Sequence, residues 1–373
     1  MCGKGSLGRM SLLRGGRSPA VWLGSIGRLI LLPGGGKVAS LQESKVNNVP
    51  LVVGSLDVAP GTVGFGSITC AWLADSTLLE IPLIGVNGRY EGPRLWVNST
   101  MHGPEIPGIE VIRRVLREEI DPLQLHGSIV GAPILSPLAY RAATYFTPVD
   151  GLNLASVFTR DMSDLPSLTH RMARRVYEAV SACDYIIDLH ANPSPALIFT
   201  MVPQGEGEVI QRSLELAEAF GVTTIRDLEN KGNLVDNAIN DGKPSLVLEL
   251  TSWEHIDEDA VAIGVEGLLN VCSRLGMLDR AEQHIELKRT VVVSGALTRL
   301  ELFSERGGIV SFTKSRGEEV RSGEVVAIIR NPLGDVEEEL RSPADGWLLA
   351  YPLTQNQSTF TGETVVYIAI PLQ

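Results

Sequence analysis

Residues 98–108, NSTMHGPEIPG, and residues 185–193, YIIDLHANP, each have the pattern of a buried strand that ends in a loop. The first segment carries His102 and Glu105, and the second carries His190. Two neutral imidazole nitrogens and one carboxylate oxygen are a ligand set typical of catalytic zinc ions, which keep a fourth position for water. If these three side chains converge on one metal ion, the protein is a hydrolase.

Around these two segments, apolar runs alternate with stretches in which apolar residues recur at helical spacing. This alternation predicts an α/β fold with a mainly parallel mixed sheet that helices cover on both faces. In such sheets ligands bind beyond the carboxyl ends of the strands, where we expect the three candidate ligands and Glu249. The predicted strands are 93–100, 127–135, 185–190, 196–202 and 245–250, and the predicted helices are 108–120, 167–183, 207–221 and 257–276.

The pattern changes near residue 286, where short strands separated by Gly-containing turns follow one another without helical spacing. We therefore expect a catalytic domain over 46–285 and a smaller all-β domain over 286–373. Residues 1–40 contain basic but no acidic side chains, and Arg28 interrupts their apolar run. This run fits neither a signal peptide nor a membrane span. Residues 1–45 are expected to be a poorly ordered basic extension, with a transit peptide as the alternative.

The 373 residues carry a net charge of −12, and 44% of them are hydrophobic. An acidic surface disfavours nucleic acid or an anionic membrane as the main partner, so we expect a small-molecule substrate. The four cysteines, Cys2, Cys70, Cys183 and Cys272, lie far apart in the chain, which indicates free thiols in a reducing, cytoplasmic compartment. The β domain has two roles open to it, capping of a pocket or self-association into a homo-oligomer.

Each candidate position also has an ordinary structural interpretation. His102 and Glu105 could belong to a helix start with an acidic residue that favours the helix dipole. His190 could be a structural histidine, although Asp188 shares its face of the strand and could orient its ring. Glu249, within LVLEL, could form a surface ion pair or act as a general base toward water.

Several motifs in chain order resemble those of one known family. They are His102-Gly-Pro-Glu105, Asp150-Gly-Leu-Asn153-Leu, Asp188-Leu-His190 and Glu249. This series is similar to the succinylglutamate desuccinylase/aspartoacylase family, which belongs with the zinc carboxypeptidases, over about residues 50–373. The β domain also resembles the family's single-hybrid-like C-terminal domain, through Gly-Gly-Ile309, Gly317–Gly323 and Ser342–Gly346.

The resemblance implies that His102, Glu105 and His190 ligate one Zn²⁺ per chain. It also implies that Glu249 activates water and then protonates the departing amine. The implied reaction is hydrolysis of a non-peptide amide bond in a small N-acyl amine or N-acyl amino-acid-like substrate. Two alternatives stay open, namely a non-catalytic or weakly active relative that binds a ligand or partner, and an esterase or carboxypeptidase of the same fold.

The sequence departs from the family pattern at the positions that hold a substrate carboxylate. Family members have an arginine before the Asp-Gly step and an Asn-Arg pair after Asn-Leu, whereas this chain has Tyr145 and Ala155-Ser156. We therefore expect a substrate that is less acidic than N-acetyl-aspartate or succinylglutamate, or one that is held differently. For Trp253, a packing role is the alternative to lining the pocket. The candidate substrate-binding residues are Arg141, Tyr145, Asn153, Ser156, Arg160 and Trp253.

Overall fold

The computed structural model describes residues 47–159, 166–193, 196–227, 232–287, 292–353 and 357–372. The extension expected over residues 1–45 and the candidate Arg160 lie outside these segments. Residues 45–373 form one compact unit, and the domain boundary expected at residue 286 stays a prediction. Within the described segments, no helix combines the length and the apolar character needed to cross a membrane.

Within the described residues, the large sheet contains strands from the predicted catalytic domain and from the predicted C-terminal β domain. They are β3 (Thr62–Trp72), β4 (Leu78–Asn87), β5 (Tyr90–Ser99), β6 (His126–Ala132), β7 (Tyr185–Asn192), β8 (Phe199–Pro203), β9 (Thr223–Asp227), β10 (Ser245–Thr251), β11 (Leu297–Phe303), β13 (Glu319–Val320), β16 (Gly346–Ala350) and β18 (Thr364–Pro371). Their order is β13-β16-β18-β11-β9-β8-β10-β7-β5-β6-β4-β3.

The centre of this sheet confirms the predicted α/β fold with a mixed sheet. Strand β7 runs parallel to both β5 and β10, and it pairs Asp188 with Asn98 and His190 with Glu249. Strand β8 runs antiparallel to β10, which makes the sheet mixed. The carboxyl ends of β5, β7 and β10 therefore meet at one edge, where polar side chains follow apolar ones.

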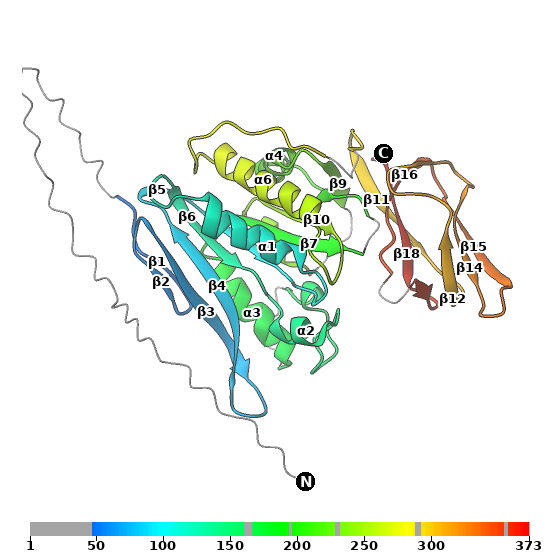
Figure 1. The fold of residues 1–373 in the computed structure, drawn as a ribbon, viewed down its shortest axis with the longest axis horizontal. Helices are drawn as coiled ribbons and strands as arrows, with labels where there is room; N and C mark the ends of the chain where they lie inside the picture. The colour runs from blue at the N-terminus through cyan, green and yellow to red at the C-terminus, as the bar shows by residue number, and fades with distance from the viewer. Residues whose placement is uncertain are drawn as a thin grey trace, which may run out of the picture. The chain divides into compact units, whose positions relative to one another are not determined.

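Helices cover both faces of the sheet, as the sequence pattern predicts. Figure 1 shows the helices packed around the sheet. Apolar residues of α1, α4 and α6 share one buried cluster, and those of α3 and α5 belong to another. Ser167 caps α3 by accepting a hydrogen bond from the His170 backbone N–H, and Gly221, with φ +61°, follows α4. The helices are α1 (Pro107–Arg114), α2 (Pro137–Ala142), α3 (Leu168–Val180), α4 (Glu208–Ala219), α5 (Leu234–Asn240) and α6 (Glu258–Arg274), with a π-helical turn at Val115–Glu119 and a 3-10 turn at Leu154–Ser156.

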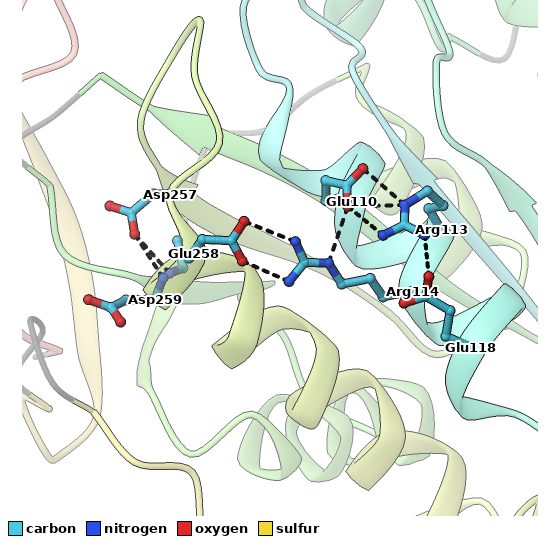
Figure 2. A network of polar contacts seen from close by, with 8 residues as sticks. Glu110, Arg113, Arg114, Glu118, Asp257, Glu258 and Asp259 are labelled. Carbon is cyan, nitrogen blue, oxygen red and sulfur yellow. Dashed lines mark hydrogen bonds and ion pairs between the residues drawn. The ribbon is translucent and has the colours of Figure 1, made fainter.

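A network of charged side chains joins α1 to α6 at the protein surface (Figure 2). The Nη1 and Nη2 atoms of Arg114 lie 2.8 and 3.0 Å from the carboxylate oxygens of Glu258, and Glu110 accepts hydrogen bonds from both Arg113 and Arg114. The helices also approach closely, because a Cβ on Gly264 would lie 2.6 Å from a methyl of Val111. Since α1 follows β5 and α6 follows β10, this contact fixes two strand ends relative to each other.

The C-terminal strands belong to two sheets. Strands β11, β13, β16 and β18 continue the large sheet, where Leu297 of β11 pairs with Ile225 of β9. A shared core, with members such as Phe199 and Val247 on one side and Leu297 and Leu349 on the other, joins this region to the rest. The remaining strands are β12 (Gly308–Phe312), β14 (Val325–Arg330), β15 (Val336–Arg341) and β17 (Ser358–Thr359) in a second sheet, and β1 (Leu51–Val53) with β2 (Leu56–Val58) in a hairpin.

Candidate metal centre

The loop after β5 presents His102 and Glu105 in a fixed backbone conformation. Thr100 has φ +55°, a strained value for a β-branched residue, and its hydroxyl donates to the carbonyl of Glu105 over 3.1 Å. Gly103 lies against α2, where a Cβ would come within 2.1 Å of the Ala139 carbonyl oxygen. Only glycine therefore allows this loop to reach its position between the strand end and α2.

The side chains of His102, Glu105 and His190 converge at the edge of the sheet. The Nδ1 atom of His102 lies 2.7 Å from Oε1 of Glu105, and Nδ1 of His190 lies 3.0 Å from Oε2. One candidate ligand atom from each residue lies within 4.8 Å of the other two. All three residues are buried, at 3%, 4% and 9% exposure. The structure therefore brings together the group that the sequence singles out, in an arrangement that could hold a metal ion.

The outer nitrogen of each imidazole ring has a polar partner of its own. Nε2 of His102 lies 3.0 Å from Oδ1 of Asn153, and Nε2 of His190 lies 3.2 Å from Oδ2 of Asp188. Asp188 also accepts a hydrogen bond from Nδ2 of Asn98 over 2.5 Å. An acceptor behind Nε2 favours the tautomer that carries its proton there, and this leaves Nδ1 able to coordinate a cation.

The electrostatic field of the cluster favours positive charge between the rings. Burial alone would raise the pKa of the Glu105 carboxyl, but His102 and His190 outweigh it and lower this pKa to about 2. Burial alone would lower the pKa of the His190 ring, yet the carboxylates of Asp188 and Glu105 raise it well above its usual range. A metal ion bound by Nδ1 of His190 would take the place of a proton in the same field.

Glu249 lies next to this cluster on β10, in register with His190 on β7. Its Oε2 accepts a hydrogen bond from Nδ2 of Asn192 over 2.8 Å. Burial raises the pKa of the Glu249 carboxyl to about 7, with the positive charge of His190 opposing this rise. A carboxyl with that pKa can both accept and return a proton near neutral pH.

The cluster and Glu249 line one cavity of about 280 Å³. Among the predicted substrate-binding residues, Tyr145, Asn153, Ser156 and Trp253 line it, whereas Arg141 is exposed at the end of α2 and does not. The ring of Tyr145 stacks on that of His102, with centroids 3.7 Å apart. The predicted catalytic domain therefore contributes the aromatic rings of Tyr145 and Trp253 and the amide of Asn153 to the cavity wall.

The indole of Trp253 has both a lining and a packing contact. It faces the cavity, and its Nε1 donates to the carbonyl of Ala191 over 2.6 Å. Ser252 and Glu254 on either side have φ of +81° and +59°, which marks a strained turn after β10. The Glu254 backbone N–H also donates to the carbonyl of Pro104 over 2.9 Å, so this turn is tied to the loop of the metal cluster.

Several polar residues near the site were not singled out from the sequence. Asn98 and Asn192 could have been found by strand alternation, because Asn98 pairs in register with Asp188 and Asn192 follows His190 by two residues. No short-range pattern identifies the cavity residues of the C-terminal region, because only the tertiary fold places them there. These are Arg299, Glu301, Pro352 and Tyr367.

Comparison with known proteins identifies both a family and a fold. The model of the succinylglutamate desuccinylase/aspartoacylase catalytic domain matches residues 91–275. The product-bound ectoine utilization protein EutE (DoeB) from Ruegeria pomeroyi is 20% identical, with a TM-score of 0.72 over 86% of this chain and 98% of that chain. A succinylglutamate desuccinylase/aspartoacylase from Rhodobacter sphaeroides is 21% identical, with a TM-score of 0.72 over 85% and 98%.

An aspartoacylase family protein from Mesorhizobium loti is 23% identical, with a TM-score of 0.70 over 88% of this chain and 100% of that chain. At these identities, the solved structures show a shared fold. No curated protein sequence gives a significant match. The segment that the family model matches contains all three members of the metal cluster and Glu249. The chain therefore belongs to the succinylglutamate desuccinylase/aspartoacylase family, whose members are deacylase hydrolases.

Proposed function

We propose that this chain is a zinc-dependent hydrolase that cleaves the amide bond of a small N-acyl amine or N-acyl amino-acid-like substrate. One observation carries the proposal, namely that Nδ1 of His102 and Nδ1 of His190 both face Glu105 in a cavity that Glu249 also lines. Membership of a family of amide-cleaving deacylases supports an amide as the bond that is broken.

The donor set fits zinc, because two imidazole nitrogens and one carboxylate oxygen lie within 4.8 Å of one another. His102, Glu105 and His190 would hold the ion, and Asn153 and Asp188 would keep the two rings oriented. When bound, zinc supplies a Lewis acid for the scissile carbonyl and lowers the pKa of water.

Glu249 would move the proton between the two reactants. It accepts a proton from water as the water oxygen attacks the carbonyl carbon, and it delivers this proton to the amine nitrogen as the C–N bond breaks. The hydrogen bond from Asn192 holds one carboxylate oxygen in place during both transfers. The products are the free acid and the free amine.

The cavity wall supports a substrate held differently from an N-acyl dicarboxylate. Tyr145 stacks on His102 where the resemblance expects an arginine, and no Lys or Arg from the described part of the catalytic region lines the cavity. Burial raises the pKa of Tyr145 well above its usual range, so its hydroxyl stays neutral and can only form hydrogen bonds there.

Metal analysis of the purified protein, followed by a panel of N-acyl amines assayed with and without chelator, tests the proposal. We expect one zinc per chain, and turnover that chelation abolishes and added zinc restores. Matched esters and C-terminal peptides in the same panel separate an esterase or carboxypeptidase from an amidohydrolase. The replacement of an arginine by Tyr145 favours a second candidate, a relative that only binds its ligand. Bound metal and ligand without any turnover would support this second candidate.

A further inference from the structure

We propose that Arg299, on strand β11 of the C-terminal region, binds a carboxylate group of the substrate. This inference rests on the proposed function and assigns a specificity-determining residue of the same site, which would hold a carboxylate on the amine half of the N-acyl substrate. Arg299 is the one Lys or Arg among the described residues that line the cavity. A planar guanidinium is well suited to a carboxylate, because its parallel N–H groups match the two oxygens.

Strand geometry places Arg299 toward the cavity together with two neighbours. Residues two apart on a strand share a face, so Arg299 and Glu301 point to the same side of β11. Glu301 pairs in register with Tyr367 on the antiparallel strand β18, which puts the Tyr367 ring on that side as well. All three residues line the cavity, and they form its C-terminal wall.

The contacts of Arg299 hold its guanidinium in a defined orientation. Its Nη2 lies 3.0 Å from Oε1 of Glu301, while Oε2 of Glu301 accepts a hydrogen bond from the Thr364 hydroxyl over 3.2 Å. The guanidinium carbon lies 4.5 Å from the centroid of the Tyr367 ring. The Arg299 side chain is only 12% exposed, so its charge is poorly screened by water. An oriented and poorly hydrated guanidinium binds an anion more strongly than a mobile surface arginine does.

The position of this wall relative to the catalytic residues is set by buried packing. Leu297 of β11 and Ala369 of β18 share a core cluster with Met201 and Val247, which both line the cavity as well. The positive charge of Arg299 lies close enough to Glu249 to oppose the rise in the pKa of that carboxyl. Glu249 and Arg299 line the same cavity, so a substrate that fills it would contact both.

Paired substrates test the proposal in the zinc-loaded, full-length protein. We would assay N-acetyl amino acids, each beside its C-terminal carboxamide, which removes the charge and keeps the size. Arg299→Gln should raise the KM for the acids about 10- to 100-fold, the usual effect of losing a hydrogen bond to a charged group. The KM for the carboxamides should change less than about 3-fold, since a neutral amide gains little from the lost charge.

Two matched variants separate loss of binding from loss of fold. Arg299→Lys keeps the charge but not the planar fork, so its KM for the acids should lie between those of the wild type and Arg299→Gln. Arg341→Gln changes an exposed arginine on β15, outside the cavity, and should leave both substrate series unaffected. Thermal unfolding of each variant shows whether the fold is intact.

A binding measurement keeps this inference distinct from the proposed function. Calorimetry with zinc-loaded Glu249→Gln and the same acid and carboxamide pairs reports affinity without turnover. The proposal requires that the acids bind to Glu249→Gln more tightly than the carboxamides do. It also requires that the double variant, Glu249→Gln with Arg299→Gln, lacks this preference. If no N-acetyl amino acid is hydrolysed but the preference is present and Arg299-dependent, the proposed function fails and the carboxylate site stands. An absent preference, or one that Arg141→Gln removes instead, overturns the carboxylate site.

Discussion

Glu249 on β10 lies directly beside His190 on β7, in register on neighbouring parallel strands. The proposed general base and a candidate metal ligand therefore lie on two neighbouring strands at the same level of the sheet. Because backbone hydrogen bonds fix the register of both strands, the distance between the two side chains depends little on loop conformation.

Replacement of Glu249 by Gln should lower kcat sharply and leave the metal cluster intact. The amide cannot accept the proton of the attacking water, and loss of a general base commonly costs about 10²- to 10⁴-fold in rate. Steady-state kcat on the best N-acyl amine, together with zinc content, checks this expectation. Unchanged kcat at full zinc content would exclude Glu249 as the base.

The rate should depend on pH through the Glu249 carboxyl, whose pKa burial raises to about 7. A base must be deprotonated, so kcat/KM should fall on the acid side as this carboxyl takes up a proton and should level off at higher pH. Bound zinc favours the carboxylate, so in the loaded enzyme this fall should lie at or below that value. Asn192→Ala removes a hydrogen bond that favours the charged form, and the acidic limb should therefore move to higher pH. A profile that is identical in both proteins would contradict the role given to Asn192.

Replacement of Asp188 by Asn should weaken metal binding while the fold is retained. The carboxylate lies 3.2 Å from Nε2 of His190 and holds the ring in place, and loss of such a partner typically costs about 10- to 100-fold in metal affinity. Competition with a zinc chelator measures the affinity. Asp75→Asn, at an exposed turn, is the matched control and should bind zinc as the wild type does.

Replacement of Gly103 by Ala should lower the free energy of unfolding by about 1–3 kcal/mol, because the new methyl would overlap the Ala139 carbonyl. Urea unfolding of the zinc-free protein measures this change without the contribution of bound metal. Gly307→Ala is the control, since the nearest atom to its Cβ would be 3.4 Å away. Equal stability of the two variants would show that the loop adapts at no cost.

The sequence predicts the position of the cluster but not the shape of the cavity. Apolar runs that end in polar residues locate His102, His190 and Glu249 at strand ends, because strand length and burial leave a local pattern. The direction of β8 relative to β10 leaves no such pattern, since an apolar run has the same composition in either orientation. Strand β9 follows Gly221 closely and mixes Thr and Arg with one buried apolar residue, so the sequence pattern did not predict it.

The C-terminal wall is harder to predict for a different reason. Arg299 lies in an alternating strand pattern, in which a charged residue is usually taken to face solvent. It faces the cavity because β11 joins the large sheet beside β9, a pairing between segments far apart in the chain. Such a contact depends on the whole fold, and a local pattern carries no information about it. The roles of Arg299 and of the predicted site residues stay predictions until they are measured.

The shared core between the two regions limits how far the chain can be shortened. A fragment that stops at residue 275, where the family match ends, would expose Phe199 and Val247 to water. Such newly exposed apolar surface favours aggregation. The same truncation would also remove the C-terminal wall of the cavity. Expression work aimed at a minimal active enzyme should therefore keep the chain at least through β18.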